Sequence, residues 1–214
     1  MKRLIVMLFA TFVSALIAPG LGLAAEPQAG RDFKVVNPPL PTPKGKIEVV
    51  EFFSYGCPHC SAFHPLISQW AAKLPKDVSL RRSPVTFNRP AWALLSRLYF
   101  ALDTTGDLAK LDGAVFAAIH EQRVIFRNDQ DVTSWAATKG ADAKKLGDAL
   151  NSFSMQSRVL RADQDAAAAH IGGVPSLLVD GRYLISSEAA ASFEELLKLT
   201  DAVIAKARQE HSGK

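Results

Sequence analysis

Residues 47–54 read IEVVEFFS, a run of β-branched and aromatic side chains interrupted only by Glu48 and Glu51. A strand that is apolar at successive positions has to be buried on both faces, as in a sheet covered by helices. Pro58 follows at a position that suits the first turn of a helix, where its missing N–H would have been unpaired anyway. The sequence therefore predicts a central strand that leads directly into a helix.

This helix is expected over residues 58–74, where apolar residues recur at helical spacing. A further strand is expected over residues 78–87, although Pro84 interrupts it. Strand, helix and strand in this order form one βαβ unit, the building block of an α/β fold.

Residues 90–170 then show almost only helical patterns, with apolar clusters separated by turn stretches. That is too much helix for a simple crossover between two strands. We therefore expect an all-helical subdomain inserted into the α/β domain.

Strands return at residues 176–179 and 182–185, joined at Asp180-Gly181, a pair typical of tight hairpin turns. Ser192 and Glu195 form a capping-box pattern at the start of the last helix. A short strand is also expected over residues 32–36. These elements divide the chain into 25–89 and 171–208 for the two halves of the α/β domain, 90–170 for the helical insertion, and 209–214 for a frayed tail.

The first 24 residues have the three parts of a secretory signal peptide: Lys2 and Arg3, an apolar run over residues 4–17, and a small-residue exit ending at Ala24. The run is shorter than the roughly 20 residues of a spanning helix. An uncleaved membrane anchor is the alternative. Cleavage would lower the formal net charge from +4 to +2, which gives no electrostatic reason to expect nucleic-acid binding.

Cys57 and Cys60 are the only cysteines in the 214 residues, in the motif Cys-Pro-His-Cys. A structural disulfide is one interpretation, but closing so short a loop removes little chain entropy. A metal site is another, with His64 one helical turn beyond Cys60. A closed zinc site needs four ligands, however, and His120, His170 and His211 are scattered along the chain.

A redox centre is the third interpretation of this motif. Cys57 lies at the N-terminus of the predicted helix, where unpaired N–H groups and the helix dipole favour a thiolate. A protonated His59 would add positive charge. We therefore expect a lowered pKa for Cys57 and a more buried, less acidic Cys60.

Val174 and Pro175 precede the strand at residues 176–179 and follow two glycines. An X-Pro bond at the start of a strand is a place where a cis peptide can occur, although most such bonds are trans. A cis bond here would present the backbone of Val174 to a ligand. An ordinary turn proline is the alternative.

Taken together, EFFSYGCPHC at 51–60, Gly-Val-Pro at 173–175, Asp-Gly-Arg-Tyr at 180–183 and the intervening helical block resemble the DsbA family of periplasmic disulfide oxidoreductases. The resemblance covers the whole chain after the signal peptide. It implies a thioredoxin fold with a helical insertion, and a monomer without cofactor or metal in the periplasm of a Gram-negative bacterium.

The resemblance also implies roles for individual residues. Cys57 would be the exposed nucleophile and Cys60 its buried partner, with His59 stabilising the Cys57 thiolate. Pro58, Val174 and Pro175 would contact the client peptide. The clients would be unfolded exported proteins with free cysteines, and an inner-membrane quinone reductase, DsbB, would restore the disulfide.

Glu51 and Arg82 match a charged pair that the family has beneath the disulfide, as a proton and charge relay or as a plain salt bridge. Family members often carry a second acid on the active-site helix, where this chain has His64. A thiol reductase or disulfide isomerase on the same fold is the alternative function, because a CxxC pair can run in either direction. A thiol-binding or metal-binding module is a more distant alternative.

Overall fold

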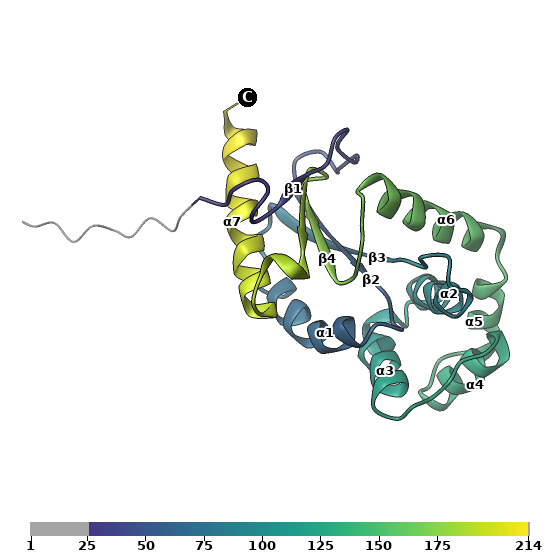
Figure 1. Cartoon of the computed structure of the whole chain (residues 1–214). Coiled ribbons are helices and arrows are strands. Elements are labelled where there is room, and N and C mark those ends of the chain that lie inside the picture. The colour runs from purple at the N-terminus through teal and green to yellow at the C-terminus, as the bar shows by residue number, and fades with distance from the viewer. Residues whose placement is uncertain (1–25, 214) are drawn as a thin grey trace, which may run out of the picture.

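The computed structural model describes residues 26–213. A five-stranded sheet carries helices on both faces, and a block of helices extends from one end of it (Figure 1). The predicted signal peptide lies outside the described residues. Within residues 26–213, no helix combines the length and apolar character needed to cross a bilayer.

The sheet has the strand order β1-β5-β4-β2-β3, in which β2 and β3 are parallel and the other neighbours are antiparallel. The strands are β1 (Lys34–Val35), β2 (Ile47–Phe53), β3 (Val78–Pro84), β4 (Ser176–Val179) and β5 (Tyr183–Ser186). The helices are α1 (Pro58–Ala71), α2 (Pro90–Thr105), α3 (Leu108–His120), α4 (Asp129–Thr138), α5 (Ala143–Leu150), α6 (Phe153–Ala168) and α7 (Phe193–Ser212), with a 3₁₀ turn at Ser187–Ala189.

All seven residues of β2 are buried, as its sequence predicts. Val49 packs with α1 and α7 on one face, where Phe63 and Leu196 belong to the same apolar cluster. Phe52 packs on the other face in a cluster that includes Ala166 of α6. Successive side chains of a strand point to opposite faces, so Glu51 lies on the face of Val49, beneath α1.

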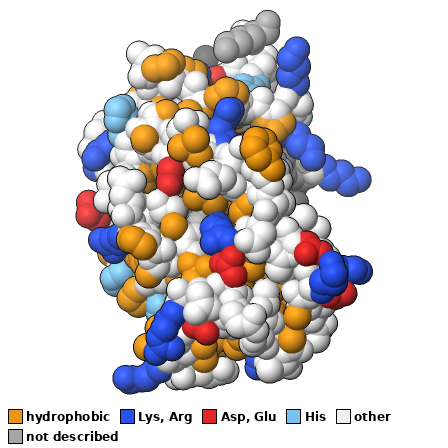
Figure 2. Space-filling model, turned by 90° about the vertical axis from the view of Figure 1, so that its right-hand side faces the viewer, with side chains coloured by type: hydrophobic (Ala, Val, Ile, Leu, Met, Phe, Trp, Pro, Cys, Tyr) orange, Lys and Arg blue, Asp and Glu red, His pale blue; other side chains and the backbone are white. Residues whose placement is uncertain are grey.

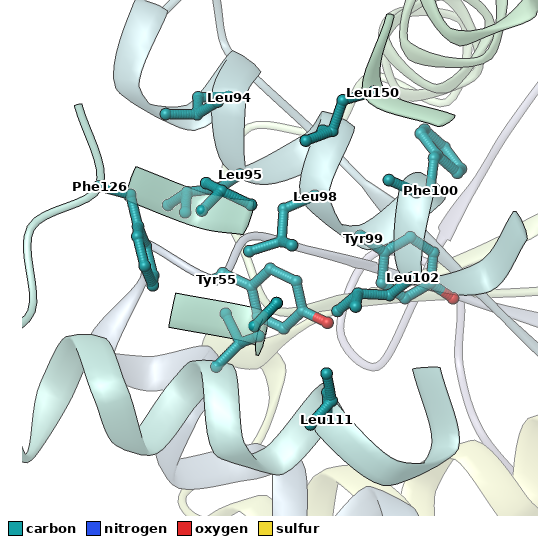
Figure 3. Packing of buried hydrophobic residues seen from close by; sticks show 14 of the residues in the cluster. Tyr55, Leu94, Leu95, Leu98, Tyr99, Phe100, Leu102, Leu111, Phe126 and Leu150 are labelled. Atoms are coloured by element: carbon teal, nitrogen blue, oxygen red, sulfur yellow. The ribbon is translucent and has the colours of Figure 1, made fainter. Parts of the chain in front are cut away.

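Helices α2 to α6 lie between β3 and β4 in the sequence and form their own apolar core, which confirms the predicted α/β fold with a helical insertion. Figure 3 shows the ring of Tyr55 between side chains of α2 and Leu111 of α3. Cys60 belongs to the same cluster. The insertion therefore packs directly against the segment that carries the two cysteines.

The outer side of the insertion mixes basic, acidic and apolar side chains (Figure 2). Arg97 pairs with Asp129 at 2.6 Å, and Arg158 pairs with Asp103 at 2.5 Å. Partly exposed pairs of this kind contribute little to stability, about 0–1 kcal/mol each. They place charges of both signs side by side on the insertion.

Two predicted elements end earlier in the structure than in the sequence analysis. Helix α1 ends at Ala71 rather than at residue 74, because Pro75 follows and the chain closes into tight turns before it. Strand β3 ends at Pro84 rather than at residue 87. Phe87 and Asn88 have φ angles of 46° and 57°, which no strand can accommodate.

The hairpin turn between β4 and β5 has the backbone that Asp180-Gly181 predicts. Both residues have positive φ angles, 53° and 65°, and the N–H of Arg182 donates to the carbonyl of Val179. A Cβ atom at Gly181 would lie 2.1 Å from the carbonyl oxygen of Leu40. This position therefore requires glycine for space as well as for backbone conformation.

The predicted frayed tail at residues 209–214 begins within α7, which continues to Ser212. The hydroxyl of Tyr183 donates to Glu210 at 2.7 Å, and the imidazole of His211 lies 2.9 Å from the carboxylate of Asp180. These contacts to the β4–β5 hairpin hold the last turn. At the other end of α7, Ser192 caps the N–H of Glu195 as predicted, while Glu195 reaches back to Ala191.

Candidate active site

Cys57 is the N-cap residue of α1, at the point where the buried strand β2 turns into the helix. Its backbone is extended, with φ −95° and ψ 120°, and its carbonyl accepts the first hydrogen bond of the helix, from Ser61. Pro58 and His59 are exposed on the first turn. The thiol of Cys57 therefore lies at the positive end of the helix, where backbone N–H groups have no partner within the helix.

The two thiols are free and have opposite electrostatic environments. The pKa of Cys57 is lowered to about 6, first by a hydrogen bond with the Cys60 thiol and then by the N–H groups of Cys60 and His59 and the charge of the His59 imidazole. Burial opposes these effects. Burial also raises the pKa of Cys60 far above its ordinary value, and the neighbouring charges of Cys57 and Glu51 add to the shift.

Cys57 is less accessible than the resemblance implies. It is 6 % exposed, while Cys60 is fully buried. Cys57 contacts the carbonyl group of Val174 and belongs to the apolar cluster of the insertion, so little of its surface is left for an incoming sulfur atom. The contrast between the two cysteines remains, because Cys57 alone retains any contact with solvent.

The Val174–Pro175 peptide bond is cis, and this loop lies against the cysteine motif. Sγ of Cys57 lies 3.4 Å from the carbonyl oxygen of Val174, to which the protonated thiol donates, across 117 positions of sequence. Pro175 is buried, whereas Gly173 is exposed with open space around it. The sequence-predicted residues Cys57, Val174 and Pro175 are thus brought together at one surface.

The insertion packs against Gly56, the residue before Cys57, through Trp92, a residue that the sequence analysis did not select. A Cβ atom at Gly56 would lie 2.6 Å from the indole nitrogen of Trp92. Arg89 stacks over the same indole ring at 4.7 Å. His120 of α3 contacts the carbonyl oxygen of Tyr55 at 2.7 Å, so this histidine holds the loop that precedes the motif.

Glu51 and Arg82 are paired by a hydrogen bond beneath the motif, as proposed from the sequence. The parallel register of β2 and β3 places them opposite each other, and Nε of Arg82 donates to Glu51 at 2.5 Å. Arg82 also stacks on the ring of Phe53 at 4.0 Å. Glu51 is fully buried, and burial raises the pKa of its carboxyl group, although Arg82 acts in the opposite direction.

Asp112 of α3 joins this pair and was missed in the sequence analysis. Its carboxylate accepts hydrogen bonds from Arg82 and from the hydroxyl of Tyr55, the latter at 2.5 Å. His64 of α1 lies 3.6 Å from the same carboxylate. An acid within the otherwise apolar stretch LDGAVFAAI is the signal that could have suggested a buried role.

The remaining histidines do not converge on the cysteines. His170 is exposed after α6, and His211 contacts the β4–β5 turn. Within residues 26–213, no three metal-ligating side chains gather at one point. The arrangement around Cys57 instead offers one stabilised thiolate, one buried thiol and a carbonyl group beside them, which suits thiol–disulfide exchange.

The fold and this site define a thioredoxin-like thiol:disulfide oxidoreductase with a CxxC active site. Residues 48–198 match the family described as DSBA-like thioredoxin domain, and the chain belongs to the DsbA family. It is 38 % identical over 208 residues to the thiol:disulfide interchange protein DsbA of Bordetella pertussis, with 93 % of this chain and 98 % of that protein covered.

A second relative, DsbA of Pseudomonas aeruginosa, is 37 % identical over 191 residues, which span 87 % of this chain and 90 % of that protein. The crystal structure of Pseudomonas aeruginosa DsbA superimposes with a TM-score of 0.83 at 36 % identity, covering 86 % of this chain and 96 % of that chain. The oxidoreductase DsbA from Xylella fastidiosa gives a TM-score of 0.80 at 30 % identity, covering 86 % of this chain and 98 % of that chain.

Proposed function

We propose that this protein introduces disulfide bonds into exported proteins in the periplasm by giving away its Cys57–Cys60 disulfide. The observation that carries this proposal is the place of Cys57 at the N-terminus of α1, which lowers its pKa to about 6, beside a buried Cys60 whose pKa is raised. A stabilised thiolate is a good leaving group, so its disulfide is a strong oxidant. The predicted signal peptide supports action outside the cytoplasm.

The reaction follows from exchange chemistry. A client thiolate attacks Cys57 Sγ, the Cys57–Cys60 bond breaks, and Cys60 leaves with the electron pair. A second client thiolate then attacks the client sulfur of the mixed disulfide and expels Cys57 as a thiolate. The client gains a disulfide, and the enzyme retains two electrons and a dithiol.

The client is expected to bind as an extended segment along Val174 and Pro175. The backbone groups of Val174 beside Cys57 can pair with the client main chain, which suits a catalyst that accepts many unfolded sequences. Pro58 and His59 are exposed on the first turn of α1, next to Cys57 in the chain. His59 is assigned a minor stabilising role on the Cys57 thiolate, after the Cys60 thiol and the backbone N–H groups.

Reoxidation is assigned to a quinone reductase of the inner membrane of the DsbB type. Glu51 is assigned the role of proton carrier for Cys60, because it is buried, its charge acts on Cys60, and burial raises its pKa. Arg82 holds this carboxyl group in place.

Two measurements on the purified chain test the oxidase function. The Cys57/Cys60 pair, equilibrated with glutathione buffers, should have a potential well above the about −270 mV of thioredoxin. The pH dependence of Cys57 alkylation should show a midpoint near 6. A potential close to that of thioredoxin would favour the reductase alternative, and a Cys57 that stays protonated at neutral pH would contradict the proposal.

The lowered pKa also predicts how pH affects the reduced form. An unfolded thiol has a pKa near 9.0, so the thiolate of Cys57 stabilises the folded reduced chain most fully above that value. This stabilisation decreases as the pH falls and is lost below about 6. Acidification should therefore lower the melting temperature of the reduced form relative to that of the oxidised form.

A further inference from the structure

Asp112 links the helical insertion to the charged pair beneath the cysteines. It lies on α3, yet its polar contacts reach Tyr55 after β2, Arg82 on β3 and His64 on α1. Its side chain is 15 % exposed. A carboxylate with three such contacts from three elements is held in one position by the tertiary packing.

Arg82 is shared by two carboxyl groups, Glu51 and Asp112. If both were ionised, the group would carry a net charge of −1, and an uncompensated buried charge is costly. Glu51 is fully buried, whereas Asp112 retains some exposure. The proton therefore belongs on Glu51, and Asp112 is the carboxylate that compensates the charge of Arg82.

Two further observations support this distribution. The charge of Asp112 raises the pKa of Glu51, in addition to the effect of burial. Among the described residues, Oε1 of Glu51 has no hydrogen-bond partner, while Oε2 accepts from Arg82. Oε1 is thus the oxygen available to carry a proton.

We propose that Asp112 is a positioning residue for disulfide exchange: by compensating the charge of Arg82, it keeps Glu51, the buried carboxyl group of β2, protonated. This proposal rests on the proposed function, in which Cys60 is the leaving group. The active-site helix α1 contributes His64 to this group, and the inserted helix α3 contributes the second carboxyl group, Asp112.

The proton transfer balances within the exchange step. The client sulfur forms a bond to Cys57 Sγ, the Cys57–Cys60 bond breaks, and its electron pair goes to Cys60. Cys60 takes the proton of Glu51 and becomes a thiol, while Glu51 becomes a carboxylate. Burial makes a Cys60 thiolate unfavourable, so a nearby acid assists its departure.

The charged and titratable groups around Glu51 come from four elements: Arg82 of β3, Asp112 of α3, Cys60 of α1 and Tyr99 of α2. Burial raises the pKa of Tyr99, and the same holds for Tyr55 beside Asp112, so both stay neutral. Burial lowers the pKa of His64, which favours its neutral form. Arg82 therefore remains the cation that the two carboxyl groups share.

The test is Asp112→Asn, which keeps an acceptor for Tyr55 and removes the charge. Arg82 then has Glu51 as its remaining carboxyl partner in the group, and the pKa of Glu51 should fall. Carbon NMR of labelled Glu side chains, assigned with Glu51→Gln, measures this directly. Oxidation of a dithiol peptide at pH 7 should slow by at least about tenfold, within the range that a positioned acid contributes, and recover towards pH 5.

Asp103→Asn is the matched control. It removes a carboxylate from an arginine pair of the same insertion, with Arg158 at 2.5 Å, and should leave the pH–rate profile unchanged. The double variant His64→Glu/Asp112→Asn returns a carboxylate to the group from α1. It should regain most of the rate at pH 7.

The proposal is overturned if Asp112→Asn leaves the Glu51 titration and the pH–rate profile as they are in the wild type. An equal slowing at every pH would also overturn it, because that pattern indicates a structural role alone. If the wild-type chain itself fails to oxidise the peptide, the proposed function is wrong, while the Glu51 titration still decides the role of Asp112.

Discussion

The surroundings of Cys57 and Cys60 differ sharply although less than one helical turn separates the two residues. Cys57 faces the helix N-terminus, the carbonyl of Val174 and a small opening to solvent. Cys60 faces the apolar core of the insertion and the charged group of Glu51 and Arg82. The pKa of Cys57 is lowered and that of Cys60 raised, so one motif combines a stable thiolate with a protonated thiol.

In this chain, the difference in pKa between the two cysteines comes from position and burial more than from the side chains of the two intervening residues. Pro58 permits the tight entry into α1, and His59 adds the last of the contributions to the pKa of Cys57. The larger contributions to the lowered pKa of Cys57 come from the Cys60 thiol and from the backbone N–H groups of Cys60 and His59. Substitutions near Cys57 and substitutions near Cys60 should therefore have separable effects.

The largest effect is expected from removing either cysteine. Cys57→Ser should abolish exchange with oxidised glutathione, because the remaining thiol is buried and protonated. Cys60→Ser should stop at a stable mixed disulfide between Cys57 and glutathione, because no second thiol resolves it. Mass spectrometry distinguishes these products from the wild-type disulfide. A mixed disulfide on Cys60 in the Cys57→Ser chain would contradict the assignment.

Among changes near Cys60, Arg82→Met is expected to destabilise the fold most. It leaves two carboxyl groups without their cation, and breaking a buried pair costs about 3–5 kcal/mol. Chemical denaturation should show this loss at pH 7 and a smaller loss at pH 4, where the carboxyl groups can be protonated. An unchanged midpoint at both pH values would mean that the ion pair does not stabilise the fold.

Gly56→Ala tests the Cys57 side, where Trp92 covers the turn before the motif. The new methyl group would lie 2.6 Å from the indole nitrogen, so the ring or the loop has to move. Overpacking of this kind costs about 1–3 kcal/mol. We expect a lower melting temperature, a changed tryptophan emission and faster alkylation of the uncovered Cys57. Gly113→Ala serves as a control, because its added methyl group would lie 3.5 Å from Nε2 of His64, an ordinary contact distance.

The smallest effect is expected for His59→Ala. It removes the charge of the imidazole and keeps the backbone N–H, so the pKa of Cys57 should rise slightly. Cys60→Ala removes the hydrogen bond from the Cys60 thiol, which is the largest contribution to the lowered pKa of Cys57. It should therefore raise that pKa further. Alkylation rates between pH 4 and 9 give both shifts. The reverse order would show that the imidazole dominates the stability of the thiolate.

The sequence predicted the elements whose signals are local. The apolar run of β2, the proline at the start of α1 and the Asp180-Gly181 turn each determine their own conformation. The motif at 57–60 and the Val174–Pro175 bond could be related to each other through the family resemblance. In the structure, Sγ of Cys57 lies 3.4 Å from the carbonyl oxygen of Val174.

Contacts that depend on how the insertion packs could not be predicted in the same way. Asp112 and Trp92 reach the motif because α3 and α2 lie against it, and no local pattern encodes that placement. The last turn of α7 is polar and suggested fraying, but partners on the β4–β5 hairpin stabilise it. Phe87 favours a strand by residue type, while its positive φ angle follows from the turn into α2.

The contact between His64 and Asp112 has a consequence for how this chain can evolve. Replacing His64 alone with an acid would place a third carboxyl group beside Arg82, and losing Asp112 alone would leave that guanidinium with a single carboxyl partner from the group. Each intermediate would shift the charge beneath the disulfide. Substitutions at positions 64 and 112 should therefore occur as compensating pairs across lineages, with the acid moving between the active-site helix and the insertion.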